Sequence, residues 1–369
     1  MNCENSSVQA CPKSNFTQNE KSTKATQLFK DKIPFWIKAL LLLALVAMIL
    51  LSFAWGRYAI SPQELIQGIH NHFFNSDVLL VNEEVARIDK VIFNVRFPRI
   101  LLVVLVGAAL SVAGASYQGM FKNPLVSPDI LGSSAGASFG ACIALLFNMP
   151  NYMVQFFAFA GGMIAVGMAV WLTRIVKYDA ILGLVLGGIL VSTLFQSGTS
   201  LIKYVADAQD KLPEITFWLM GSFSSVNKTD LFTVIIPMIC GFAILLLQSW
   251  KLNVLSFGDE EARAMGISTR NVRLSVIFAS TLLTSLSVAV SGIIGYVGLV
   301  IPHLARAIVG PNYKVLLPTS MFVGATFLLI IDNISRLVTD IGIPIGILTS
   351  ILGVPFFIII FRRQMKGWK

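Results

Sequence analysis

Long apolar runs separated by short polar stretches recur along most of the chain. A helix needs about 20 apolar residues to cross the hydrocarbon core of a bilayer, and by that measure the pattern predicts about ten membrane-spanning helices. The expected spans are residues 34–55, 98–119, 129–148, 153–173, 180–202, 231–250, 274–292, 293–309, 315–332 and 343–361. The predicted fold class is therefore an all-α polytopic membrane protein.

Three polar stretches interrupt this pattern. In residues 57–97, Ser61 precedes a proline and an amphipathic run, which predicts a short capped helix. In residues 251–273, three acidic residues open a segment that Gly266 would close, which predicts a compact loop helix. Residues 213–225 predict a half-length helix over Phe217–Gly221, too short to span.

Composition supports a location in the membrane. Hydrophobic residues make up 55% of the chain and charged residues 13%, with a mean hydropathy of +0.76, whereas soluble proteins carry about 25% charged residues. The net charge of +9 could suggest a nucleic-acid partner. Most of the 28 lysines and arginines, however, fall on one side of the predicted topology. This positive-inside bias predicts cytoplasmic N- and C-termini and a lipid bilayer, with no nucleic acid, as the surroundings.

The chain divides into a tail and one membrane domain. Residues 1–33 are polar and lysine-bearing, which predicts a disordered cytoplasmic tail. Residues 34–363 form the transmembrane domain, with 57–97 as an outer loop and 251–273 as a cytoplasmic loop. The four cysteines lack metal-ligand spacing and no phosphate-binding loop motif occurs, so we predict no metal site and no cofactor. Energy for any transport must then come from a partner or a gradient.

The last span carries an unusual density of helix breakers. Glycine and proline recur between Pro344 and Pro355 within an apolar run. Breakers are tolerated in a membrane where neighbouring helices or a lined cavity satisfy the freed backbone groups. This pattern is more typical of helices packed around a pathway than of a simple anchor, and it indicates a transport protein.

Several motifs, in this order and spacing, resemble the FecCD-type permease subunits of type II ABC importers for iron chelates and cobalamin. The resemblance covers about residues 55–363. Its motifs are Arg96–Arg99, Gly107–Leu110, Gln118, Asn123–Leu125, Pro128, Leu131–Gly132, Gly136–Ala137, Gly258–Gly266, Gly295–Arg306, Asp332–Arg336 and Pro344–Pro355. Residues 310–314 depart from the family pattern, which leaves the local contacts of that loop open.

The resemblance implies a cobalamin-permease-like fold and a set of partners. These are a second permease (an identical copy or a paralogue), two ATP-binding cassette ATPase subunits and an extracytoplasmic substrate-binding protein. It implies a bacterial cytoplasmic (inner) membrane location. The chain itself would then be no enzyme and hold no catalytic residue, because a separate subunit hydrolyses ATP.

The resemblance also assigns roles to individual residues. Docking of the binding protein falls to Arg96, Arg99 and Arg336, although on charge alone snorkelling interfacial cations would explain such positions. Asp332 lies four residues before Arg336 and is expected to pair with it. ATPase coupling is assigned to Gly258, Asp259, Glu260, Glu261, Arg263 and Gly266. The remaining motif residues, taken as structural, are Asn123, Pro124, Pro302, His303, Pro344 and Pro355.

Cargo and rival functions stay open at this level. Ferric siderophores are the commonest cargo of the resembled family, with cobalamin or haem as alternatives. A gradient-driven secondary transporter would share the broken spans but would need coupling-ion carboxylates. An intramembrane serine protease would use Ser134 or Ser138, each of which lies in a Gly-x-Ser-x-Gly string. Small residues in a membrane span suit close helix packing better than a nucleophile.

Overall fold

The computed structural model describes residues 34–56, 60–74, 82–176, 180–338 and 342–366, so the predicted tail (1–33) lies outside the described residues. In the described ranges we find seven helices long and apolar enough to cross a membrane and three shorter apolar ones. Together they correspond to the ten predicted spans. They are α2 (Phe35–Ala54), α6 (Phe97–Phe121), α7 (Ser133–Leu146), α8 (Asn151–Val176), α9 (Ala180–Val205), α11 (Lys228–Leu247), α14 (Thr269–Ser291), α15 (Val297–Val309), α16 (Tyr313–Val338) and α17 (Ile345–Lys366).

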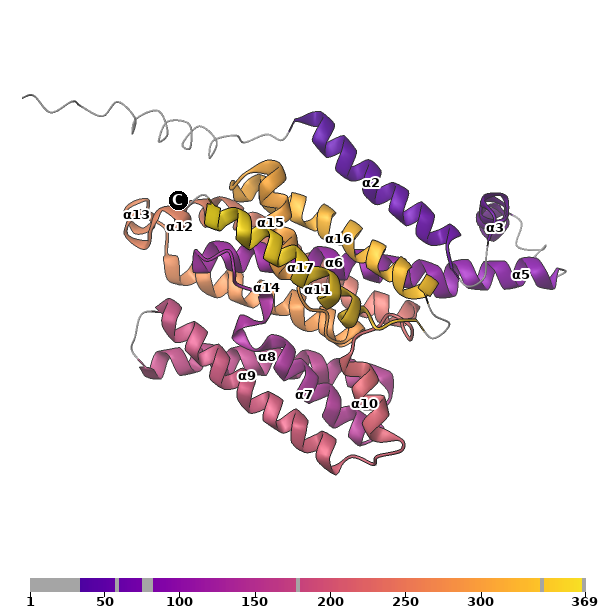
Figure 1. Ribbon diagram of the computed structural model, residues 1–369, viewed down its shortest axis with the longest axis horizontal. Coiled ribbons are helices and arrows are strands. Elements are labelled where there is room, and N and C mark those ends of the chain that lie inside the picture. The colour runs from indigo at the N-terminus through magenta and orange to yellow at the C-terminus, as the bar shows by residue number, and fades with distance from the viewer. Residues whose placement is uncertain (1–33, 57–59, 75–81, 177–179, 339–341, 367–369) are drawn as a thin grey trace, which may run out of the picture.

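Shorter elements lie at the two ends of this bundle. One end carries α3 (Pro62–Phe74), α5 (Glu83–Lys90) and α10 (Lys211–Leu219), and the opposite end carries α12 (Ser249–Phe257) and α13 (Asp259–Ala264) (Figure 1). The half-length helix predicted at Phe217–Gly221 begins earlier than expected. It ends before Gly221 because that residue has a left-handed φ of 76°.

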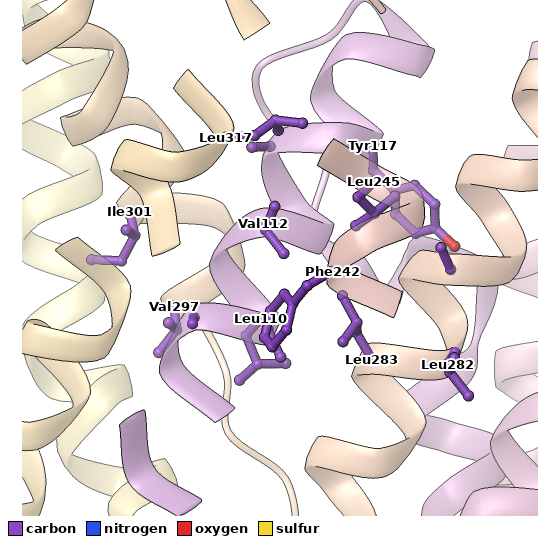
Figure 2. Close-up of a cluster of buried hydrophobic side chains, with 14 of the residues drawn as sticks. Leu110, Val112, Tyr117, Phe242, Leu245, Leu282, Leu283, Val297, Ile301 and Leu317 are labelled. Atoms are coloured by element: carbon purple, nitrogen blue, oxygen red, sulfur yellow. The ribbon is translucent and has the colours of Figure 1, made fainter. Parts of the chain in front are cut away.

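Helix α6 is the centre of the bundle. Every residue from Val106 to Phe121 is buried, and α6 packs against α11, α14, α15 and α16. The helices approach so closely that a Cβ on Gly114 would lie 1.8 Å from the carbonyl oxygen of Gly298. Small residues permit this packing in lipid, where apolar surface gives no driving force of its own. Figure 2 shows part of the apolar cluster at α6, with labels on Leu110, Val112, Tyr117, Phe242, Leu245, Leu282, Leu283, Val297, Ile301 and Leu317.

The last part of the predicted outer loop, 57–97, is helical and leads directly into α6. Helix α5 continues through a π-helical turn, η1 (Val91–Arg96), directly into α6. The resulting helix of 39 residues, Glu83–Phe121, is about 58 Å long at 1.5 Å per residue and exceeds the thickness of a hydrocarbon core. Pro98 would clash with a carbonyl four residues earlier in a regular helix. The π-helical turn η1, which widens the backbone locally, lies just before Pro98 and includes the residue four positions earlier.

Candidate transport pathway, arginine cluster and coupling helix

The exposed side of helix α9 changes character along its length. Leu186, Leu190 and Leu194 are exposed apolar residues that suit lipid. In the second half of the helix, exposed polar residues recur every three or four residues, at Thr193, Gln196, Ser197 and Ser200. The hydroxyl groups of Thr193, Ser197 and Ser200 each donate to the carbonyl four residues earlier, at 2.9–3.0 Å. We call these four residues the polar face of α9. Exposed polar groups at membrane depth line a cavity or a subunit contact rather than lipid.

The polar face of α9 borders a groove of about 470 Å³ between α7, α9 and the end of α10. Lys203 contributes a cation to this groove, and the carboxylate of Asp129, which accepts a hydrogen bond from Ser134, contributes an anion. Its lining residues are Asp129, Gly132, Ser134, Ala135, Ser138, Ser192, Gln196, Thr199, Ser200, Lys203, Leu219 and Ile293. Sequence reasoning missed this groove, although the spacing of hydroxyl residues on an otherwise apolar helix was a usable signal.

A second recess adjoins the groove and shares two of its lining residues. Leu219 and Ile293 line this recess of about 380 Å³ together with the start of α17. Between α14 and α15 the backbone is unwound, with left-handed φ values of 68° at Gly292 and 65° at Tyr296. Across the second recess, at the start of α17, the amide of Gly346 donates to the carbonyl of Met220 at 3.1 Å. The predicted span 293–309 is therefore helical only from Val297, and this unwound backbone faces a recess, as expected for broken spans beside a pathway.

The two serines of the Gly-x-Ser-x-Gly strings make local contacts only. Ser134 donates to Asp129, and Ser138 donates to the carbonyl of Ser134 at 2.7 Å. Among the described residues that line the groove, none is a histidine that could act as the base of a serine nucleophile.

Removal of either hydroxyl should reduce transport only modestly. We expect Ser134→Ala and Ser138→Ala each to keep cargo uptake within about tenfold of the parent, because a single hydrogen bond contributes only about 0.5–1.5 kcal/mol. Uptake by cells that carry each variant, normalised to the permease content of the membrane, checks this. A nucleophile would behave differently, since loss of its hydroxyl would abolish activity altogether.

Three arginines lie where α2, α6 and α16 meet, and two of them, Arg99 and Arg336, bind one carboxylate. Arg99 donates to Asp332 at 2.8 Å, and Arg336 lies 3.1 Å from the same carboxylate, which confirms the expected Asp332–Arg336 pair. Asp332 is fully buried, and the side chains of Arg99 and Arg336 are 13% and 11% exposed. The pairing of Arg99 with Asp332, 233 positions apart, could not be predicted from local spacing.

The same cluster holds α2 against the bundle. Helix α2 buries only Ser52, whose hydroxyl accepts from Asn333 at 2.7 Å. Arg96 donates to the carbonyl of Phe53, and Arg336 donates to that of Trp55 at 3.3 Å. Arg96 is 4% exposed, so it is buried rather than snorkelling. The arginines predicted to dock a partner are thus engaged within the chain, and their docking role stays a prediction.

The predicted coupling helix has the expected form. Helix α13 begins at Asp259, after Gly258 with φ 151°, and the chain turns at Gly266 with φ 77°. Ala262 is fully buried and holds the helix against the bundle. Facing outward are Glu260, Glu261, Arg263 and Gly266, together with the exposed apolar side chains of Phe257 and Met265.

Asp259 differs from its neighbours on α13. Its carboxylate lies 2.7 Å from Arg273 of α14 and 3.7 Å from Lys122 at the end of α6. It therefore ties the projecting helix to two bundle helices, whereas the other acidic residues of α13 remain exposed.

The structural motif residues also have local explanations. Asn123 accepts a hydrogen bond from the amide of Leu125 at 2.9 Å in the turn after α6, with Pro124 between them.

The remaining motif residues lie at helix breaks or inside helices. Pro302 is buried within α15 and His303 follows it, half-buried. Pro344 directly precedes α17, and Pro355 lies inside that helix.

Comparison with known proteins identifies the family. The model of the FecCD transport family matches residues 43–363. The chain belongs to this family. Members of the FecCD family are permease subunits of ABC importers, multi-pass membrane proteins that work with separate ATPase subunits and a binding protein.

Individual relatives cover nearly the whole chain. The molybdate import permease MolB of Haemophilus influenzae is 39% identical over 89% of this chain and 95% of its own length. A probable iron chelatin permease of Helicobacter pylori is 36% identical over 87% of this chain and 96% of its own. A solved structure described as an inward-facing metal-chelate type ABC transporter has 39% identity and a TM-score of 0.77, covering 88% of this chain and 97% of that one. Other relatives are named for hemin and cobalamin transport.

Proposed function

We propose that this chain is the permease of an ATP-driven, binding-protein-dependent importer whose cargo is a ferric siderophore. The observation that carries this proposal is the polar face of α9, exposed on a helix that otherwise presents leucine to lipid. In the proposed orientation both termini and α13 are cytoplasmic, in a bacterial inner membrane, and α3, α5 and α10 face outside.

A second permease would complete the pathway. The polar face of α9, the unwound segment and the start of α17 are exposed in one chain, and polar groups at membrane depth need a wet or protein-lined neighbour. An identical copy related by two-fold symmetry would bring the same wall to the opposite side. A paralogue with the same wall would serve equally, so a homodimer and a paralogous heterodimer both fit the proposal.

The arginine cluster would guide the binding protein through its field. Arg99 and Arg336 share the single carboxylate of Asp332, which leaves an excess of positive charge where the proposed outer ends of α2, α6 and α16 meet. Such a field accelerates the approach of an acidic partner even where the cations are too buried to touch it. At the opposite end, the exposed residues of α13 would enter a cleft of the ATPase.

The names of the relatives suggest two classes of cargo, a metal chelate and an oxyanion. A ferric siderophore fits the relatives named for iron chelates, and haem or cobalamin would use the same machinery. Molybdate is a second candidate, because the permease named for it shares 39% identity with this chain and because Lys203 and several hydroxyl groups suit an anion. In both cases the groove would offer the cation of Lys203 and several hydroxyl groups to the cargo, with the carboxylate of Asp129 also in its lining.

Uptake measurements in a strain that lacks the gene separate these candidates. We expect loss of uptake of one ferric siderophore, restored by the parent gene. Lys203→Ala should lower the rate about tenfold, the effect of about 1.4 kcal/mol on an anion. Lys228→Ala, on an exposed residue at the start of α11 outside the groove lining, is the matched control and should leave uptake unchanged.

Other outcomes would redirect or reject the proposal. Loss of molybdate uptake alone would select the second cargo, and loss of haem or cobalamin uptake would select one of those. Uptake that persists without the ATPase and stops when the proton gradient is collapsed would mean a secondary transporter.

A further inference from the structure

Helix α3 is a firmly built element rather than a loose connection. Its N-terminus is closed by two reciprocal hydrogen bonds: the amide of Ser61 donates to the Glu64 carboxylate at 2.7 Å, and the amide of Glu64 donates to the Ser61 hydroxyl at 3.2 Å. These bonds stabilise the charged form of Glu64 and lower the pKa of its carboxyl group. The helix therefore keeps its shape in its exposed position.

The rotation of α3 about its own axis is fixed by its packed face. Gly68 lies so close to α5 and η1 that a Cβ there would meet the side chain of Ile92 at 2.9 Å. The His72 ring stacks on Phe93 with centroids 3.8 Å apart and bonds Asp89 at 2.7 Å. A helix held this way at two successive turns presents one defined face to its surroundings.

That outward face is apolar. Ile66, Ile69 and Phe73, spaced three and four residues apart, are 69%, 43% and 66% exposed. We call these three residues the α3 stripe. Gln67 and Asn71 lie on the opposite side of the helix, so α3 is amphipathic apart from its packed face. Nothing within the described residues covers the α3 stripe.

The position of α3 relative to the bilayer follows from α2. The 20 residues of α2, all apolar except Lys38 and Ser52, match the hydrocarbon thickness, and the last turn of α2 meets Arg96 through the carbonyl of Phe53. Arg96 therefore marks the boundary of the hydrocarbon core. Ile92, against which Gly68 packs, lies four residues earlier, about 6 Å beyond that boundary along the helix.

The orientation of the α3 axis also suits a position at the membrane surface. In Figure 1, α2, α6 and α16 run across the view, whereas α3 is seen end-on at the end of the bundle. Its axis is therefore nearly perpendicular to the spans and parallel to the membrane plane. Amphipathic helices that lie in this plane bury their apolar face about 5–10 Å into the boundary between headgroups and acyl chains.

We propose that the α3 stripe is a membrane-surface anchor that inserts Ile66, Ile69 and Phe73 into the headgroup region of the outer leaflet. The contact continues the lipid surface of α2, which buries a single residue and ends in the exposed indole of Trp55, a side chain suited to the interface. The anchor holds α5 and the arginine cluster at a fixed height, where a binding protein approaches.

Lipid fits the α3 stripe better than a protein partner does. None of its three residues is charged or polar, whereas the surface of a transient protein partner is only partly apolar and relies on polar contacts at its rim. The adjoining exposed surface of α2 is itself apolar from Ala39 to Ala54 and has a lipid neighbour in any membrane.

Site-directed labelling of the full-length permease–ATPase complex tests the proposal. Cys3, Cys11, Cys142 and Cys240 are first replaced by alanine, and a polarity-sensitive fluorophore is placed at Ile69→Cys or Phe73→Cys. Gln67→Cys and Asn71→Cys on the opposite side are the matched controls. The complex is inserted into vesicles of phosphatidylethanolamine and phosphatidylglycerol, and quenching by nitroxide-labelled lipid and by aqueous iodide is measured. ATPase activity of each labelled complex confirms that it is folded.

The expected result is a contrast between the two sides of α3. Labels on the α3 stripe should be quenched by lipid nitroxide at least about threefold more than the controls, and the controls should be quenched more by iodide. Equal iodide quenching on both sides would overturn the proposal. So would shielding of the stripe that arises only after a binding protein is added, because the surface would then be a protein docking site.

Discussion

Replacement of Gly266 by Asp is expected to abolish cargo uptake while the permease remains inserted in the membrane. Gly266 lies at the exposed end of the turn after α13 with φ 77°, and a Cβ added there meets no atom within 4 Å. The substitution therefore creates no clash inside the chain. Its effect falls on whatever surface receives α13, which in our proposal is the cleft of the ATPase.

The size of the expected loss follows from desolvation. An unpaired carboxylate taken from water into a protein contact costs several kcal/mol, and each 1.4 kcal/mol is a factor of ten in affinity. We expect ATPase co-purification to fall at least about a hundredfold, with uptake lost in parallel. Permease content of the membrane, measured by immunoblot, should stay near the parent level.

Gly266→Asn is the matched control for this prediction. Asn and Asp have nearly the same shape and both tolerate the left-handed conformation better than other side chains, so the two variants differ chiefly in charge. Gly266→Asn should keep most of the uptake. Equal loss in both variants would mean that backbone strain, rather than charge, is responsible. Normal coupling in both would remove α13 from the ATPase contact.

Local patterns in the sequence were sufficient for most of the fold. Apolar run length predicts helices such as α2 and α16 within a few residues, because lipid requires each span to satisfy its own backbone. The start of α6 was predicted within one residue, but the helix before it was missed because the polar residues of α5 resemble a loop, although they form a helix that extends beyond the bilayer. The unwound segment before α15 was counted as helix because its composition is as apolar as that of a span.

The candidate sites also divide into those formed by residues adjacent in the sequence and those formed by distant segments. Helix α13 could be predicted because its acidic first turn and closing Gly266 are adjacent in sequence. The pairing of Arg99 with Asp332 and of Asp259 with Lys122 joins distant segments, and no local rule identifies such partners. The groove beside α9 was missed for a different reason. A polar side chain every three or four residues shows a helix face, but only the fold shows that the face is left uncovered.

Asp332→Asn is expected to destabilise the permease strongly. Asn keeps the shape of the side chain but removes its charge, and the nearly buried guanidinium groups of Arg99 and Arg336 then lack a counter-ion. Loss of one partner from a buried ion pair costs about 3–5 kcal/mol. Asp230→Asn is the control, since Asp230 is also buried but accepts hydrogen bonds from neutral donors at Gln155 and Asn227. It should cost less than half as much in the free energy of unfolding, measured in nanodiscs.

A second substitution separates stability from docking. Arg99→Gln combined with Asp332→Asn removes one cation and one anion, so the net charge of the cluster is unchanged. Part of the stability lost in Asp332→Asn should return, because one uncompensated cation fewer remains in the interior. If the cluster acts on a binding protein through its field, the association rate of the binding protein with the double variant should equal that of the parent at every salt concentration. A slower rate in the double variant would instead mean that Arg99 contacts the binding protein directly. No recovery of stability would show that the charge of Arg99 does not destabilise Asp332→Asn.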